Sequence, residues 1–105
     1  MTKYTIIGLG RIGTSLGMAI RSKGDAKVIG YDAENNAQTL AQRMGAVDTV
    51  EWNMDKAVED SDVVIVSTPA GSLYDVFDGI STHLKAGAVV TDTSPTKRAV
   101  MEWAQ

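Results

Sequence analysis

Residues Gly8-Leu9-Gly10-Arg11-Ile12-Gly13 form a glycine-rich turn near the start of the chain, and this stretch decides the fold. The run from Tyr4 to Ile7 before it is short and rich in residues that favour strands. Beyond it, apolar residues recur at helical spacing until Gly24, at Ile12, Leu16, Ala19 and Ile20. A strand, a G-x-G-x-x-G turn and a helix in this order predict a turn that binds phosphate groups.

Each glycine of this turn has an expected role. Gly8 allows the sharp turn out of the strand, Gly10 lets a pyrophosphate approach the backbone, and Gly13 lets the helix pack closely on the strand. The phosphates would then meet free N–H groups and the positive end of the helix dipole. We therefore predict that residues Gly8, Leu9, Gly10, Arg11, Ile12 and Gly13 bind the cofactor. Arg11 is either a further positive charge for a phosphate or a solvated side chain of the first helical turn.

The remaining sequence alternates between strand and helix patterns. Further strands are expected at 27–31, 46–50, 63–67 and 88–91, and further helices at 37–44, 55–59, 73–84 and around Ala99, Val100 and Trp103. This alternation predicts one α/β domain over residues 1–105, a Rossmann-type doubly wound parallel sheet with strand order 3-2-1-4-5. We expect it to lack the sixth strand and the helical substrate domain. Ligands of such sheets bind at the carboxyl ends of strands 1 and 4.

Asp32 follows the second expected strand, at the spacing where this fold places a carboxylate for the ribose hydroxyls of the adenosine. A carboxylate there repels the extra phosphate of NADP, and no arginine lies in residues 32–36 to accept one. The sequence therefore favours NAD over NADP. The alternative is that Asp32 only caps the next helix. Glu34 is expected to be a charge in the first turn of that helix.

Ser67, Thr68 and Pro69 follow the fourth strand, across the expected crevice from the glycine turn. We include all three among the predicted cofactor-binding residues because of their place at the point where the strand order reverses. Initiation of the next helix explains Pro69 equally well.

Composition excludes several classes of function. The net charge is −3 without a basic run, so no nucleic-acid partner is expected. The chain has no cysteine, which excludes disulfides and cysteine-based zinc sites, and no metal site is predicted. A membrane span needs about 20 apolar residues, and none is present. These features predict a cytoplasmic protein.

Three segments, at residues 6–17, 61–69 and 89–97, resemble prephenate and arogenate dehydrogenases, the oxidoreductases of tyrosine biosynthesis. The first two segments are shared with 6-phosphogluconate and hydroxyisobutyrate dehydrogenases. The third resembles the Asp-x-x-Ser-x-Lys segment of the prephenate family through Asp92 and Lys97, but Pro95 occupies the position of the serine. The role of that serine is therefore carried over to neither Ser94 nor Thr96. Ser94-Pro95 also suits an N-cap followed by the first residue of a helix.

The resemblance implies the cofactor half of an NAD-dependent dehydrogenase that acts on a small-molecule substrate. The family's catalytic histidine and substrate-binding arginines lie beyond the fifth strand, so the substrate half is expected beyond Gln105, in a following helical domain, or on another chain of a homo-oligomer. The single histidine, His83, is expected to interact with helix-terminal carbonyls, and no catalytic residue is assigned. Two alternatives stay open, a cofactor domain of the 6-phosphogluconate or hydroxyacid type and a stand-alone NAD-sensing module.

Overall fold

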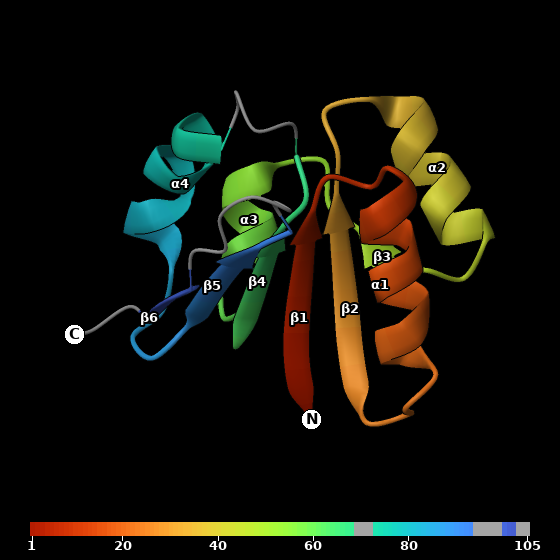
Figure 1. Cartoon of the computed structure of the whole chain (residues 1–105), viewed down its shortest axis with the longest axis horizontal. Coiled ribbons are helices and arrows are strands. Elements are labelled where there is room, and N and C mark those ends of the chain that lie inside the picture. Colours follow the sequence, from red (N-terminus) through yellow and green to blue (C-terminus); the bar gives the residue numbers. More distant parts are fainter. Residues whose placement is uncertain (69–72, 94–99, 103–105) are drawn as a thin grey trace.

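The computed structural model describes residues 1–68, 73–93 and 100–102. Strands and helices alternate from β1 to β5, as Figure 1 shows. The strands are β1 (Thr2–Ile7), β2 (Ala26–Tyr31), β3 (Thr49–Val50), β4 (Val63–Val66), β5 (Val89–Asp92) and β6 (Val100–Glu102). The helices are α1 (Arg11–Arg21), α2 (Asn35–Arg43), α3 (Met54–Val58) and α4 (Leu73–Ile80), which continues into the 3-10 turn η2 (Ser81–His83).

The strands form one sheet in the order β3-β2-β1-β4-β5-β6. The first five are parallel in the predicted order 3-2-1-4-5, so the Rossmann-type topology is confirmed. The order reverses between β1 and β4, whose register pairs Tyr4 with Val63 and Ile7 with Val66. The carboxyl ends of these two strands therefore lie side by side.

Two predictions for the end of the chain were wrong. A helix was expected around Val100, and the sheet was expected to lack a sixth strand. Residues Val100–Glu102 instead form β6, which pairs antiparallel with β5. Three residues are too few for helical and strand periodicities to be told apart, and pairing with β5 satisfies the backbone. Trp103 and residues 94–99 lie outside the described residues.

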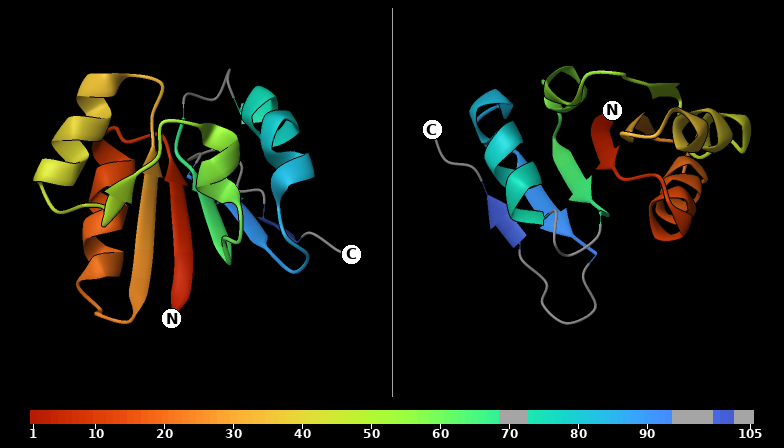
Figure 2. Two further views of the ribbon diagram at one scale, coloured as in Figure 1. Left: turned by 180° about the vertical axis from the view of Figure 1, so that it is seen from behind. Right: turned by 90° about the horizontal axis from the view of Figure 1, so that it is seen from above.

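Alternating side chains of the central strands supply a core on each face of the sheet. Ile6 and Ile65 face a cluster that α1 and α2 cover, whereas Ile7, Val64 and Val66 face a cluster that includes residues of α3 and α4. Figure 2 shows α1 on one side of the sheet and α3 and α4 on the other. A continuous apolar run in β4 is thus explained by burial on both faces.

Local sequence signals set several helix ends. Gly24 and Gly45 have positive φ values of 80° and 78° just past α1 and α2, where a left-handed residue ends a helix. Asn53 caps α3 by accepting hydrogen bonds from the N–H groups of Asp55 and Lys56. No helix in the described part of the chain is long and apolar enough to span a membrane. The cytoplasmic location stays a prediction.

Candidate functional site

The glycine turn connects β1 to α1 and is held tightly between the ends of two other strands. Gly8 has a φ of 99°, and its N–H donates to the carbonyl oxygen of Tyr31 at the end of β2, 2.8 Å away. A Cβ on Gly8 would collide with the carbonyl oxygen of Ser67, just beyond β4. The turn is therefore fixed against both neighbours of β1, and only glycine fits at its first position.

Gly10 and Gly13 differ in what surrounds them. A Cβ on Gly13 would collide with the Gly8 carbonyl oxygen, so this glycine lets α1 approach the turn and β1. A Cβ on Gly10 would meet nothing within 4 Å, and Gly10 lines a cleft. Its φ of −78° is open to any residue. Packing of the protein alone thus does not require glycine at position 10.

The three residues between these glycines contribute differently. The Leu9 side chain is buried in the core cluster beneath α1 and α2, while its N–H donates to Asp32. The side chains of Arg11 and Ile12 are exposed, and neither residue is among the described residues that line the cleft. Arg11 therefore matches its expected alternative of a solvated side chain, and contact with a cofactor stays a prediction for all three residues.

Asp32 stands at the end of β2 and joins three segments. Its Oδ2 accepts from the Leu9 N–H at 2.7 Å, and its Oδ1 accepts from the Glu34 N–H at 2.8 Å. Its own N–H donates to Oε1 of the buried Gln38, 2.9 Å away. Each carboxylate oxygen retains a lone pair for a ligand. Asp32 does not cap α2, because Glu34 occupies the N-cap position.

Ser67 and Thr68 lie past the end of β4, on the opposite wall of the cleft. The Ser67 N–H donates to the Ile7 carbonyl at 2.7 Å, and the Ser67 hydroxyl accepts from the Thr93 hydroxyl at 3.2 Å. Thr68 has a buried hydroxyl for which no partner is found among the described residues. Pro69, the last predicted site residue, lies outside the described residues.

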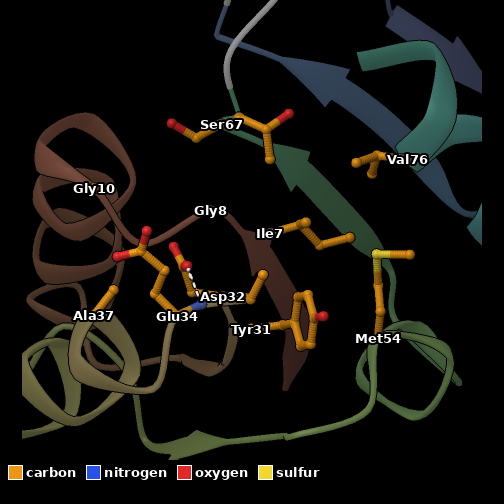
Figure 3. Close-up of a pocket in the computed structure, with 12 residues that line it drawn as sticks. Ile7, Gly8, Gly10, Tyr31, Asp32, Glu34, Ala37, Met54, Ser67 and Val76 are labelled. Carbon is orange, nitrogen blue, oxygen red and sulfur yellow. Dashed lines mark hydrogen bonds between the residues drawn. The ribbon is translucent and has the colours of Figure 1, made fainter. Parts of the chain in front are cut away.

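These elements enclose a cleft of about 510 Å³ at the carboxyl ends of β1, β2 and β4 (Figure 3). It brings together five of the predicted residues, Gly8, Gly10, Asp32, Ser67 and Thr68. One part is polar, with Asp32 and Glu34. The other part is apolar and is formed by Ile7, Tyr31, Met54 and Val76. The volume lies in the range of small-molecule sites.

Sequence reasoning missed the apolar part of the cleft. Tyr31 directly precedes Asp32 on β2, so its place at the strand end could have been foreseen. Met54 and Val76 come from α3 and α4. They reach the cleft only through the way these helices pack on the sheet, and no local pattern signals that.

The remaining polar residues of interest lie elsewhere. His83 lies 3.4 Å from Asp55 of α3, so its partner is a carboxylate rather than the expected helix-terminal carbonyls. It is not among the residues that line the cleft. Asp92 is buried at the end of β5. Ser94, Pro95, Thr96 and Lys97 lie outside the described residues. No cluster with the composition of a metal site occurs in residues 1–68, 73–93 and 100–102.

Comparisons of the sequence with known proteins also indicate a nucleotide-binding domain. The family model of the prephenate dehydrogenase nucleotide-binding domain matches residues 16–105. Prephenate dehydrogenase of Lactococcus lactis is 31% identical over 99% of this chain and 29% of its own length.

Two solved structures are also similar. Arogenate dehydrogenase of Synechocystis has 25% identity and a TM-score of 0.85 over 91% of this chain and 34% of its own. Prephenate dehydrogenase of A. aeolicus, in complex with hydroxyphenyl propionate and NAD+, has 26% identity and a TM-score of 0.78 over 88% of this chain and 33% of its own. This chain thus spans about a third of the length of the relatives it matches.

Proposed function

Because this chain belongs to the prephenate dehydrogenase family, as a nucleotide-binding domain, we propose that its cleft binds NAD for a dehydrogenase of prephenate or arogenate. The family match favours this function over a cofactor domain of the 6-phosphogluconate or hydroxyacid type. The structure of the A. aeolicus relative with NAD+ supports the choice of cofactor.

One observation carries the proposal. Gly10 opens onto the cleft where a side chain would meet no protein atom, and Asp32 lines the same cleft at the end of β2. The pyrophosphate would lie over Gly10, against the N–H groups of the first turn of α1. One ribose would then reach the lone pairs that Asp32 keeps free. The hydrogen bond from Leu9 to Asp32 fixes the distance between these two subsites.

The apolar part of the cleft suits the adenine ring. Tyr31, Met54 and Val76 together present an aromatic ring, a thioether and a branched aliphatic side chain. A flat heterocycle gains free energy when it leaves water for such a surface. Of the two nicotinamide cofactors, NAD is favoured because Asp32 would repel the additional phosphate of NADP.

NAD supplies the hydride acceptor for the oxidation of a small-molecule substrate. The residues of this chain bind and orient it. No histidine is found among the described residues that line the cleft. We therefore place the proton acceptor and the substrate-binding groups in another part of the protein or in a second subunit. The resemblance to a family with a following helical domain supports this division.

Substitution of Gly10 by alanine tests the cofactor site. The new methyl group has space within the protein, so the free energy of unfolding is expected to stay within about 1 kcal/mol of wild type. Because that space is where the pyrophosphate would lie, the affinity for NAD, measured by calorimetry, should fall at least about tenfold. Ser15→Ala, on an exposed position of α1, is the matched control and should leave affinity unchanged.

Two results would contradict the proposal. If the wild-type chain does not bind NAD, the proposed function is wrong. If Gly10→Ala binds NAD with unchanged affinity, the proposed position of the pyrophosphate is wrong. The dehydrogenase assignment is tested by the reduction of NAD with prephenate or arogenate. NAD binding without turnover in the presence of the family's substrate domain favours the NAD-sensing alternative.

A further inference from the structure

Glu34 lines the polar part of the cleft and is the N-cap of α2, one residue before the first helical turn in which it was expected. It has extended backbone angles at the N-cap of α2, and its side chain makes no capping hydrogen bond. Its N–H donates to Asp32 Oδ1, and its carbonyl accepts from the N–H groups of Ala37 and Gln38. The backbone of Glu34 is therefore held from both sides.

The Glu34 carboxylate is free to act on a ligand. Figure 3 shows the side chains of Asp32 and Glu34 projecting into the same part of the cleft, between the end of β2 and the glycine turn. In the described part of the chain, no lysine, arginine or histidine forms an ion pair with Glu34. The described residues that line the cleft include no cationic side chain. Two carboxylates thus face this subsite, and among the described residues no cationic side chain lines it.

The two carboxylates differ in how they can meet a nucleotide. Both Asp32 oxygens already accept one backbone hydrogen bond, which fixes the carboxylate for the ribose hydroxyls. The Glu34 carboxylate accepts no such bond from the described residues and is exposed. A phosphate monoester on the 2′ oxygen carries a charge of about −1.5 to −2 at neutral pH. It would be repelled by both groups, whereas a ribose hydroxyl would not.

We propose that Glu34 is a specificity-determining residue, a second carboxylate that together with Asp32 rejects the 2′-phosphate of NADP. This inference rests on the proposed function, because it assumes that the ribose of the adenosine binds at Asp32. It assigns to Glu34 a role by repulsion alone, which requires no contact with NAD. Discrimination would then persist in part when Asp32 is neutralised, and full relaxation would require both changes.

A purely structural role for Glu34 has a different signature. A carboxylate near a helix N-terminus stabilises the helix dipole, so its loss would lower the stability of α2. Such an effect would change the affinity for NAD and for NADP in the same proportion. The ratio of the two dissociation constants therefore separates rejection of the phosphate from support of the helix.

The experiment compares Glu34→Gln with Glu59→Gln. Glu59 follows α3, and its carbonyl oxygen accepts a hydrogen bond from Lys3 Nζ near the amino end of β1; Glu59 is not among the described residues that line the cleft. The two variants lose the same charge from the chain, but only the first loses it from the cleft. Dissociation constants for NAD and NADP are measured by calorimetry at low and at high salt.

In Glu34→Gln we expect affinity for NAD within about twofold of wild type and affinity for NADP about three- to tenfold higher at low salt. The gain should shrink at about 1 M salt, where the Debye length falls to about 3 Å. Glu59→Gln should leave the ratio at its wild-type value.

The role of Glu34 is overturned if the ratio of the dissociation constants for NAD and NADP shifts equally in both variants, or if it is unchanged in Glu34→Gln. Neither result contradicts the proposal that the cleft binds NAD. Failure of the wild-type chain to bind either nucleotide overturns the proposed function and this inference together.

Discussion

At the scale of single residues, two glycines of one turn are needed for different physical reasons. A Cβ on Gly10 would meet no atom within 4 Å, and we propose that a ligand uses this space, whereas Gly8 is required by the fold itself. Gly8 combines a φ of 99° with a Cβ position that the Ser67 carbonyl oxygen occupies. A side chain there would strain the backbone and push β4 away from β1.

Gly8→Ala should therefore lower the free energy of unfolding by at least about 2 kcal/mol. Chemical denaturation measures this loss, and Gly10→Ala is the matched control, for which we expect a loss of at most about 1 kcal/mol because Gly10 is the N-cap of α1. Equal destabilisation by the two substitutions would contradict the distinction between a glycine for folding and a glycine for binding.

At the scale of elements, α2 and β2 are tied together by a buried amide. Gln38 is fully buried on α2, and its Oε1 accepts the N–H of Asp32 at the end of β2. This bond holds the strand end from which the Asp32 carboxylate projects. The sequence did not indicate it, because a glutamine in an amphipathic helix is ordinarily assigned to the solvent face.

Gln38→Met keeps the volume and removes the acceptor, which leaves the Asp32 N–H without its partner. Met also removes the buried Gln38 Nε2, for which no partner is found among the described residues, and this offsets part of the cost. We therefore expect a loss of about 1 kcal/mol in the free energy of unfolding, with weaker NAD binding because Asp32 is less firmly placed. Gln42→Met, at an exposed position of the same helix, should change neither quantity. An unaltered denaturation midpoint in Gln38→Met would show that the bond does not stabilise the fold.

Elements with a strong local pattern were predictable, and those that depend on neighbours were not. The glycine turn, the strand before Asp32 and the buried run of β4 each carry their own signal, and the order 3-2-1-4-5 follows from their alternation. β6 was mistaken for a helix because pairing with β5, rather than its own periodicity, makes it a strand. Met54 and Val76 escaped prediction for the same reason.

At the scale of the whole molecule, the two ends of the parallel strands have different roles. The carboxyl ends of the strands form the cleft, while Asp62 joins segments at the amino ends. Its Oδ2 accepts the N–H of Lys3 at 2.8 Å, and its Oδ1 pairs with Lys85 Nζ at 2.6 Å. The hydrogen bond from Lys3 and the ammonium of Lys85 hold the pKa of the Asp62 carboxyl below its usual value of 3.8.

This shift predicts how stability depends on pH. A carboxyl whose pKa is lower in the folded state stabilises the fold above its unfolded pKa, and that contribution disappears as pH falls through the folded pKa. The difference in unfolding free energy between wild type and Asp62→Asn should therefore be constant from about pH 5 to about pH 7 and shrink below about pH 4. Denaturation curves across this range measure this difference, with Asp75→Asn, on the exposed surface of α4, as control.

Asp62 lies at the amino ends of the strands, whereas the cleft lies at their carboxyl ends. NAD affinity at neutral pH should therefore be the same in wild type and in Asp62→Asn. A changed affinity would mean that the ion pair at the amino ends of the strands affects cofactor binding at their carboxyl ends.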